Sequence, residues 1–397
     1  MTTPDPSMGL SHLRVVDLTR VRAGPTCCRI FADFGADVIQ VEATEGADPN
    51  STMLGARLGS DHQNLHRNKR SIALNLKTPG GLRVLMELVK TADVVVENFR
   101  PDVKDRLGFS YDQLAAVNPR IILASISGFG QTGPYAKRAG FDQIAQGMGG
   151  LMSITGEVGG EPMRAGIAVA DSSAGNYAAM GVLIALAERE RSGKGQWVQT
   201  SLLQAMIAMT DFQAASYLVE GRVPKTAGND HPYTTPMGVL PTSDGHINIG
   251  VGGEGQWASF CRAIERPDLH SNPRYAMQEL RYQNRVALMT ELSAVFRTRN
   301  SEHWSTLLTA ASVPVGPIYT MDEVFSDAQV EHVGIAAPLK HSELGDIRLV
   351  GCPLTLSRTP PSVRTQAPAH GEHTVAILRE LGISQAEISA MQVAGEI

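Results

Sequence analysis

Short apolar runs rich in β-branched residues alternate with helical patterns through the first 130 residues, and this alternation restricts the fold more than any other feature. The runs are LRVVDLT (13–19), DVIQVEA (37–43), SIALNLK (71–77), DVVVENF (93–99) and RIILASISGFG (120–130). Helical periodicity lies between several of them, as in 23–35 and 78–92. Apolar strands separated by helices are typical of βαβ units around a buried parallel sheet. We therefore expect a doubly wound α/β domain, whose ligands bind beyond the carboxyl ends of the strands.

A long helix is expected in the middle of the chain. Apolar and small residues recur on one face there, at positions 174, 177, 178, 181, 182, 185 and 186. Asp171 comes just before this pattern, in the position of an N-cap, and Gly193 follows its charged tail in the position of a C-cap. A strand, QWVQTSL, and another helical stretch to about Gly221 are expected next.

The chain changes character near Arg222 and predicts a second, smaller α+β domain. The stretch RVPKTAGNDHPYTTP is rich in turn residues and indicates a linker. VLPTSDGHINIGV (239–251) has the pattern of a β-hairpin with Asp244-Gly245 at its tip. The elements expected after it are amphipathic helices over 257–264, 280–299 and 303–311, strands over 335–357 and a closing helix over 371–391.

The composition excludes several classes of protein. Lys plus Arg total 35 and Asp plus Glu total 40, so a general polyanion binder is not expected and nucleic acid is not a predicted partner. No run approaches the ~20 apolar residues of a membrane span, and the N-terminus lacks the basic and apolar regions of a signal peptide. The four cysteines have neither CxxC nor zinc spacing, which is typical of buried thiols in a reducing compartment. We expect a soluble, cytoplasmic protein without a bound metal.

The common phosphate-binding and catalytic motifs are missing. GxGxxG is absent after the first strand, where the turn reads RVRAGP (20–25), and the chain has no GxxxxGK[ST], HExxH or GxSxG. The eleven histidines are scattered, and no two of them are expected to have ligand spacing on a shared helix face. These absences leave P-loop, zinc-protease and serine-hydrolase chemistry unsupported.

Basic residues remain at the turns between the predicted strands and helices. They are Arg20 and Arg22 after the first strand, Lys69, Arg70 and Lys77 around the third, and Arg100 and Arg106 after the fourth. In a doubly wound sheet these turns share one edge, which would gather cations around a phosphate-bearing ligand. The alternative is that exposed turns simply carry Lys and Arg, and the pattern alone favours neither interpretation.

Asp171 is the carboxylate that the sequence most strongly suggests for a chemical role. It lies in GIAVADSSAG (166–175), among small and apolar residues. It is either an N-cap, worth ~1 kcal/mol, or a partly buried carboxylate kept anionic by the helix dipole and available as a nucleophile or base. Small neighbours would let a bulky thioester approach it.

Taken together, several segments resemble the class III CoA-transferases, typified by formyl-CoA:oxalate and carnitine CoA-transferases. The resemblance covers nearly the whole chain, and the order of the segments makes it specific. They are VVDLTRVRAGP (15–25), FGADVIQVE (34–42), NKRSIALNLKTPGG (68–81), ADVVVENFRPDVKDRLGF (92–109), NPRIILASISGFGQTGP (118–134), ADSSAGNYAAMGVLIALAERERSGKGQWVQTSL (170–202) and SVPVGPIYTMDEVFSDAQV (312–330).

The resemblance implies the architecture. Members have a large Rossmann-like domain built from both chain ends and a small domain from the middle, and two subunits interlock as a homodimer. The predicted division here is a large CoA-binding domain from 1–205 and 335–397, a linking segment over 206–225 and a small α+β domain over 226–334.

The resemblance also implies the chemistry. Asp171 matches the catalytic aspartate, whose carboxylate attacks the donor acyl-CoA to form a mixed anhydride and then an aspartyl-CoA thioester. No permanently bound cofactor or metal is implied, and coenzyme A enters as part of the acyl-CoA substrate. The residues that match the family's CoA contacts are Val21, Ala23, Leu74, Lys77, Asn98, Phe99 and Arg106.

Some positions depart from the family pattern. Ala43 stands where formyl-CoA transferase has an arginine near the adenine, and Arg20 replaces a histidine. Around Gly228 the chain reads GNDHPYTTP and lacks that enzyme's glycine-rich loop, which argues against oxalate as the acceptor. QIAQGMGGLMSITG (143–156) is similar to members that handle succinyl-CoA and small dicarboxylates such as citramalate or mesaconate, and Arg164 is a candidate partner for a distal carboxylate.

Two other functions are open. The superfamily includes α-methylacyl-CoA racemases, which need two opposed bases; one matches Asp171, but the histidine of the other is replaced by Phe141. The second alternative is a non-catalytic acyl-CoA-binding protein, which would have no need of Asp171. The sequence therefore favours a CoA-transferase that uses an acyl-CoA donor, with succinyl-CoA as the candidate, and a small carboxylic or dicarboxylic acid.

Overall fold

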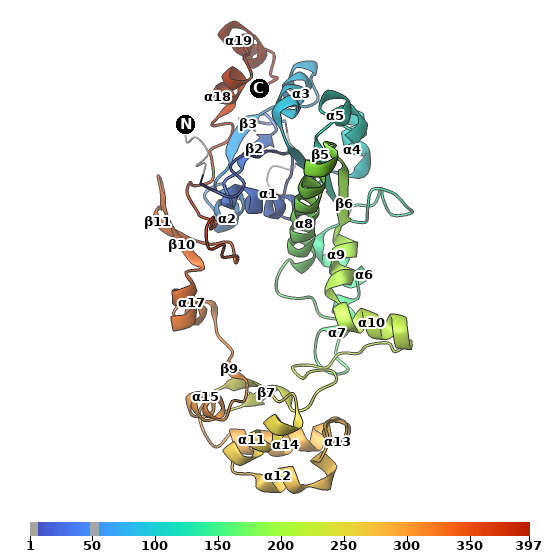
Figure 1. Ribbon diagram of the computed structural model, residues 1–397, viewed down its shortest axis with the longest axis vertical. Helices are drawn as coiled ribbons and strands as arrows, with labels where there is room; N and C mark the ends of the chain where they lie inside the picture. Colours follow the sequence, from blue (N-terminus) through green and yellow to red (C-terminus); the bar gives the residue numbers. More distant parts are fainter. Residues whose placement is uncertain (1–6, 48–54) are drawn as a thin grey trace. The chain divides into compact units, whose positions relative to one another are not determined.

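The predicted β-rich runs form one six-stranded parallel sheet in the computed structural model, which describes residues 7–47 and 55–397 (Figure 1). The spatial order is β3-β2-β1-β4-β5-β6, the order found in doubly wound dinucleotide-binding domains. The order reverses between β1 and β4, which places a switch point there. The strands are β1 (Arg14–Asp17), β2 (Asp37–Glu42), β3 (Arg70–Ala73), β4 (Val94–Glu97), β5 (Ile122–Ser127) and β6 (Trp197–Ser201).

Helices cover both faces of this sheet because successive strand residues point to opposite sides. Val15 and Val94 join the core on one face, and Val16 and Val95 join the core on the other. The first face is covered by α1 (Ala23–Asp33), α8 (Val169–Ser192) and α9 (Leu202–Met209). The second is covered by α3 (Pro79–Thr91), α5 (Tyr111–Val117), α18 (Thr374–Glu380) and α19 (Gln385–Val393). The α/β prediction is confirmed for this sheet.

The other elements around the sheet are shorter. Among them are α2 (Ser60–His66), α4 (Pro101–Leu107), α6 (Asp142–Met148), α7 (Leu151–Ile154) and α10 (Asp211–Glu220). A separate antiparallel hairpin, β10 (Ala336–His341) and β11 (Gly345–Val350), accounts for the strand character near 335–357 without joining the large sheet.

The chain divides into two units, of which the first is built from three stretches, Met1–Leu151, Arg164–Val219 and Gln329–Ile397. The second unit comprises Met152–Met163 and Glu220–Ala328. Most of the segment 206–225, which the sequence suggested as a linker, is helical, since α9 and α10 continue to Glu220.

The second unit packs helices against a three-stranded antiparallel sheet, β7-β8-β9. The predicted hairpin is confirmed, with Asp244 and Gly245 in the turn between β7 and β8. The helix expected over 280–299 is two helices that meet at Asn284. The elements are β7 (Met237–Pro241), β8 (His246–Gly250), β9 (Val315–Pro317), α11 (Glu254–Ala263), α12 (Pro267–Ser271), η2 (Pro273–Tyr275), α13 (Gln278–Gln283), α14 (Arg285–Phe296), α15 (Ser301–Ala310) and α16 (Met321–Val324). The next helix, α17 (Ala328–Val333), begins at the boundary and lies almost wholly in the first unit.

The closing helix expected over 371–391 is also two helices, α18 and α19. Gly382 lies between them with a φ of 77°, in the left-handed region that favours glycine and ends a helix.

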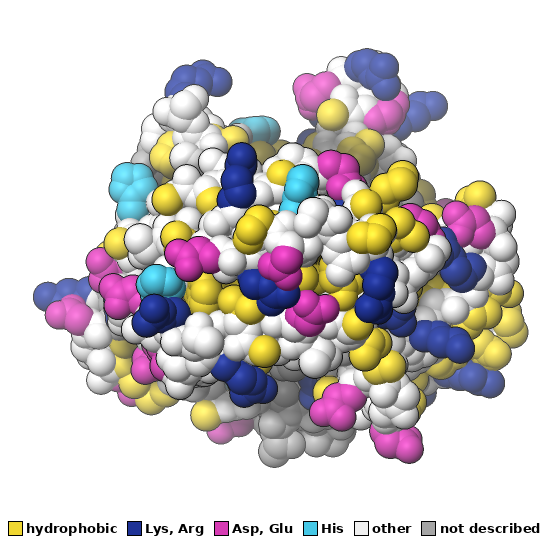
Figure 2. Space-filling model, turned by 90° about the horizontal axis from the view of Figure 1, so that it is seen from below, with side chains coloured by type: hydrophobic (Ala, Val, Ile, Leu, Met, Phe, Trp, Pro, Cys, Tyr) yellow, Lys and Arg dark blue, Asp and Glu magenta, His cyan; other side chains and the backbone are white. Residues whose placement is uncertain are grey.

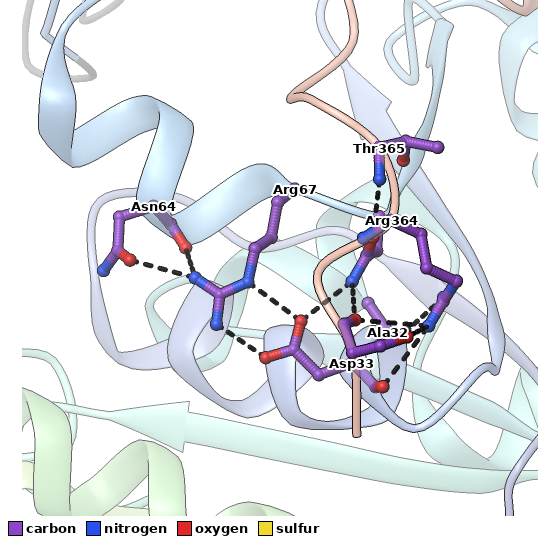
Figure 3. A network of polar contacts seen from close by, with 8 residues as sticks. Ala32, Asp33, Asn64, Arg67, Arg364 and Thr365 are labelled. Atoms are coloured by element: carbon purple, nitrogen blue, oxygen red, sulfur yellow. Dashed lines mark hydrogen bonds and ion pairs between the residues drawn. The ribbon is translucent and has the colours of Figure 1, made fainter. Parts of the chain in front are cut away.

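Within the first unit, a polar network around the buried Asp33–Arg67 pair joins the returning C-terminal segment to the N-terminal part of the chain (Figure 3). Asp33, the last residue of α1, accepts two hydrogen bonds from the Arg67 guanidinium, at 2.9 and 2.6 Å. The Asn68 amide donates to the same carboxylate, and its carbonyl oxygen accepts from the backbone N–H groups of Arg364 and Thr365. The Arg364 guanidinium then donates to the carbonyl of Ala32 at 2.7 Å. This network ties together the end of α1, the α2–β3 connection and the C-terminal segment.

The face of the molecule in Figure 2 mixes basic, acidic and apolar side chains without a continuous patch of one charge. Within the described ranges, 7–47 and 55–397, no helix has both the length and the apolar character needed to cross a membrane. In the same ranges no group of three or more His, Cys, Asp or Glu side chains is arranged to hold a metal ion.

Candidate active site

The loops after β1 and β4 are tied together at the switch point. The Arg20 N–H donates to Asn98 Oδ1 at 2.9 Å, and Asn98 Nδ2 donates back to the Arg20 carbonyl at 2.7 Å. Val21, in the same loop, has a φ of 63°, which is strained for a β-branched residue. The Phe99 N–H donates to Glu97 Oε2 at 2.8 Å, which also ties the loop after β4 to the end of its strand.

Two cavities open at this edge of the sheet, and together they contain every residue that the resemblance linked to CoA. The first, which we call the Asp171 cavity, has a volume of about 140 Å³ and contains Val21, Ala23, Asn98, Phe99 and Asp171. The second, the Lys77 cavity, has a volume of about 300 Å³ and contains Leu74, Lys77, Phe99 and Arg106. Phe99 lines both, so the cavities adjoin.

The basic residues at the turns divide into two groups. Arg20, Lys77 and Arg106 line the Lys77 cavity, and Arg22 and Arg100 line the Asp171 cavity. The other two have structural partners. Lys69 is fully buried and donates to Asp17 at 2.8 Å, and Arg70 pairs with Asp37 and Glu380. The charge pattern therefore located the edge of the sheet but included two residues that stabilise the fold.

A third cavity of about 500 Å³ adjoins the Lys77 cavity, with Arg20 and Ala43 lining both. His62 and His66 lie on its wall, one turn apart on α2, with ring centroids 4.4 Å apart. The expectation that no two histidines share a helix face at ligand spacing is therefore wrong. Burial lowers the pKa of His62 to about 4 and that of His66 well below its ordinary value, so both rings are neutral. The spacing of four residues was the sequence signal that could have identified this pair.

Asp171 lies inside the first turn of α8, so the prediction that it caps the helix is wrong. The N-cap is Ala168, which makes no side-chain cap hydrogen bond. The cap is supplied from α6 instead. Asp142 Oδ1 accepts from the backbone N–H groups of Ala170 at 2.8 Å and Asp171 at 3.3 Å. Gln146, one turn along α6, donates to Asp142 Oδ2 at 2.6 Å and to the Ile167 carbonyl at 3.1 Å.

The side chain of Asp171 is therefore free of the capping role. Burial, and to a smaller extent the nearby negative charge of Asp142, raise its pKa to about 6 against the opposing charge of Arg22. At pH 7 roughly nine in ten Asp171 side chains are ionised, since pH exceeds the pKa by about one unit. A carboxylate that is partly desolvated yet still charged is a stronger nucleophile than one in water.

Close packing of α8 on α1 sets the position of this carboxylate. A Cβ on Gly175, one turn after Asp171, would lie 2.4 Å from the carbonyl oxygen of Ala23 and 2.8 Å from Thr26 Cβ. Glycine is therefore required for the two helices to approach this closely. The approach places Asp171 beside Val21, Arg22 and Ala23 at the start of α1.

Similarity to known proteins shows the family of the chain. The sequence profile of CoA-transferase family III matches residues 10–374. The chain belongs to that family. It is 40% identical over 387 residues to the succinate–glutarate CoA-transferase of Agrobacterium fabrum, covering 95% of this chain and 97% of that protein.

Two further comparisons cover nearly the whole chain. The chain is 34% identical to the succinyl-CoA–D-citramalate CoA-transferase of Chloroflexus aurantiacus, with 99% of both chains covered. It also resembles the crystal structure of a CAIB/BAIF family protein from Brucella suis, with a TM-score of 0.81, 36% identity, and 95% of this chain and 100% of that chain covered. A member of this family is an enzyme that uses CoA thioesters as substrates, which confirms the CoA-transferase prediction.

Two residues singled out in the sequence have clear positions in this CoA-transferase. Phe141 lines the Asp171 cavity with 54% of its surface exposed, and its hydrocarbon ring cannot move a proton. Arg164 is exposed, donates to the neighbouring Ala165 carbonyl at 3.0 Å, and is not among the residues that line the Asp171 cavity.

Proposed function

We propose that this CoA-transferase moves CoA from succinyl-CoA to a small dicarboxylic acid, with Asp171 as the nucleophile. The observation that carries the proposal is the half-buried, ionised carboxylate of Asp171 in a cavity that adjoins a cation-lined cavity. The relatives named for glutarate and citramalate transfer support the choice of donor and acceptor.

The two adjoining cavities suit the two ends of an acyl-CoA. Arg20, Lys77 and Arg106 supply three positive charges for the phosphates in the Lys77 cavity. The pantetheine arm passes Phe99, which lines both cavities, and delivers the thioester to Asp171. Val21, Ala23, Leu74 and Asn98 complete the proposed contacts. Ala43 cannot supply the arginine contact to the adenine that formyl-CoA transferase has at this position. We therefore assign recognition of the adenine to the wall of the Lys77 cavity as a whole.

The reaction has four acyl-transfer steps. An oxygen of Asp171 attacks the thioester carbon, the C–S bond breaks, and a mixed anhydride and CoA thiolate form. The thiolate attacks the Asp171 acyl carbon, which releases the donor carboxylate and leaves an aspartyl-CoA thioester. The acceptor carboxylate attacks that thioester and expels the thiolate again. The thiolate then attacks the acceptor's acyl carbon, which restores the Asp171 carboxylate and forms the new acyl-CoA.

The exposed surface of α8 and α10 supports a homodimer as part of this proposal. Met180 and Ile184 lie one turn apart on α8 and are 54% and 64% exposed, and Leu218 on α10 is 79% exposed. We propose that these exposed apolar side chains are covered by the second subunit. If the two chains interlock, they must unfold to separate, so sedimentation should show a dimer down to nanomolar concentration. A reversible monomer–dimer equilibrium at micromolar concentration would contradict interlocking.

The proposed function is tested by incubating the purified protein with succinyl-CoA and a panel of organic acids. Chromatography should show acyl-CoA products of dicarboxylic acids in amounts equal to the succinate released. The same protein should not exchange the α-proton of a 2-methylacyl-CoA in deuterated water, because Phe141 replaces the second base. Enzyme-dependent deuterium incorporation without CoA transfer would favour the racemase alternative.

A further inference from the structure

Arg22 is a cation on the wall of the Asp171 cavity whose hydrogen-bonding capacity is only partly used. It precedes α1, and its side chain is 33% exposed. Among the described residues it makes one ion pair, in which Nη2 donates to Asp61 Oδ1 at 2.8 Å. A guanidinium has five N–H donors in a planar fork, so the remaining donors are available to a ligand.

The partner of Arg22 is easily exchanged. The Asp61 side chain is 59% exposed, and an ion pair open to water contributes little stability. A ligand carboxylate that reaches Arg22 from the cavity can therefore share the guanidinium or replace Asp61 at small cost. A carboxylate that binds the fork through both oxygens gains two charge-assisted hydrogen bonds.

Arg22 is placed for the far end of a substrate rather than for the reacting carboxylate. It makes no ion pair with Asp171, yet its charge lowers the pKa of that residue. The guanidinium therefore lies beyond contact distance but within electrostatic range. An acid whose reacting carboxylate meets Asp171 carries its second carboxylate a few carbon–carbon bonds away, within the same cavity whose wall includes Arg22.

The other arginines near this substrate are less suited. Arg138 lines the cavity but stacks on Tyr135, with its guanidinium carbon 3.8 Å from the ring centroid. Arg100 immediately precedes α4 and follows Phe99, the residue that lines both cavities, so we assign it to the proposed CoA path. Arg164 lies outside the cavity lining.

We propose that Arg22 is the specificity-determining residue that binds the distal carboxylate of the dicarboxylic acid. This inference rests on the proposed function and adds the group that distinguishes a dicarboxylic from a monocarboxylic acid. A monocarboxylic acid leaves Arg22 with Asp61 and gains nothing from it.

Steady-state kinetics with succinyl-CoA as donor test the assignment. Glutarate is compared with pentanoate, which has the same chain length and one carboxylate and is measured as an acceptor or as a competitive inhibitor. In Arg22→Met the KM for glutarate should rise at least about tenfold, with kcat within about threefold, as loss of charge-assisted hydrogen bonds predicts. The KM or Ki for pentanoate should change by less than about twofold. Arg22→Lys should recover part of the lost glutarate affinity because it keeps the charge.

Asp61→Asn is the matched control, since it breaks the Arg22–Asp61 ion pair and leaves the guanidinium in place. Its KM for glutarate should be unchanged or lower. The proposal is overturned if Arg22→Met leaves the glutarate KM within twofold, if glutarate and pentanoate weaken equally, or if Asp61→Asn weakens glutarate as much as Arg22→Met. If Arg22→Met does not fold, the same comparison of glutarate and pentanoate is made with Arg22→Lys. A wild-type protein that transfers no CoA to any dicarboxylic acid instead contradicts the proposed function itself, and this outcome is visible before any variant is made.

Discussion

The carboxylate of Asp142 accepts hydrogen bonds from the backbone N–H groups of both Ala170 and Asp171, at 2.8 and 3.3 Å. One side chain on α6 thus caps α8 and also places a second negative charge beside the Asp171 side chain. The cap fixes the start of the helix, and the charge raises the pKa of Asp171. Asp142 is therefore a positioning residue that also tunes the proposed nucleophile.

Replacing Asp142 by asparagine should separate these two effects. The amide oxygen still accepts from the helix N-terminus, since Asn caps about as well as Asp. The charge is lost, so the pKa of Asp171 should fall below about 6. We expect the acid limb of the kcat/KM–pH profile to move to lower pH. Asp142→Ala, which removes the cap as well, should also cost ~1 kcal/mol of stability. An acid limb that stays in place in Asp142→Asn would show that Asp142 does not tune Asp171.

Asp171→Asn should abolish transfer and stabilise the fold. An amide cannot form the mixed anhydride, so transfer should fall by several orders of magnitude while acyl-CoA still binds. Wild-type protein incubated with succinyl-CoA should carry a hydroxylamine-labile CoA adduct on the peptide containing Asp171, and the variant should not. Near-normal transfer by Asp171→Asn would exclude Asp171 as the nucleophile.

The stability of the same variant should depend on pH with a definite sign. The pKa of Asp171 is about 6 in the folded chain and near its ordinary 3.8 in the unfolded chain, so ionisation favours unfolding. This cost is absent below pH 4, grows between pH 4 and 6, and is constant above. Asp171→Asn should therefore raise the free energy of unfolding by about 1–2 kcal/mol at pH 8 and by nothing at pH 4. Urea denaturation at the two pH values measures it, and equal effects at both would contradict the raised pKa.

Much of the fold follows from local sequence patterns. The strands β1, β2, β4 and β5 fall within the predicted runs because each is a continuous apolar stretch bounded by turn residues. The edge of the sheet that carries the cavities was also predictable, since parallel strands bring their carboxyl ends together.

The rest depends on contacts between distant segments, which local patterns do not contain. The sequence could not show that Asp142, 29 residues before Asp171, supplies the cap of α8. Nor could it show that Lys69 pairs with Asp17, 52 residues away, rather than facing a ligand. The breaks at Asn284 and Gly382 likewise divide stretches that the sequence predicts as single helices.

Lys69→Met should strongly destabilise the first unit. Lys69 and Asp17 are both fully buried, and Asp17 also accepts from the Thr19 hydroxyl and N–H. Removing the lysine leaves an unpaired buried carboxylate, at a cost of about 3–5 kcal/mol. Urea denaturation measures the loss. The double variant Asp17→Asn, Lys69→Met should recover part of the lost stability, because the unpaired negative charge of Asp17 is then removed. No recovery would mean that packing, and not the charge, accounts for the effect.

Gly175→Ala should lower both stability and transfer, against the usual trend for helices. Alanine in a helix interior is normally more stable than glycine by up to ~1 kcal/mol. At position 175 the new Cβ would lie 2.4 Å from the Ala23 carbonyl oxygen, so α8 must move away from α1. That movement separates Asp171 from the loop that precedes α1, so kcat should fall together with the melting temperature. Gly255→Ala in α11 is the matched control, because its Cβ would meet nothing within 4 Å, and it should stabilise the protein. If Gly175→Ala behaves like Gly255→Ala, the close approach of α1 and α8 does not set the position of Asp171.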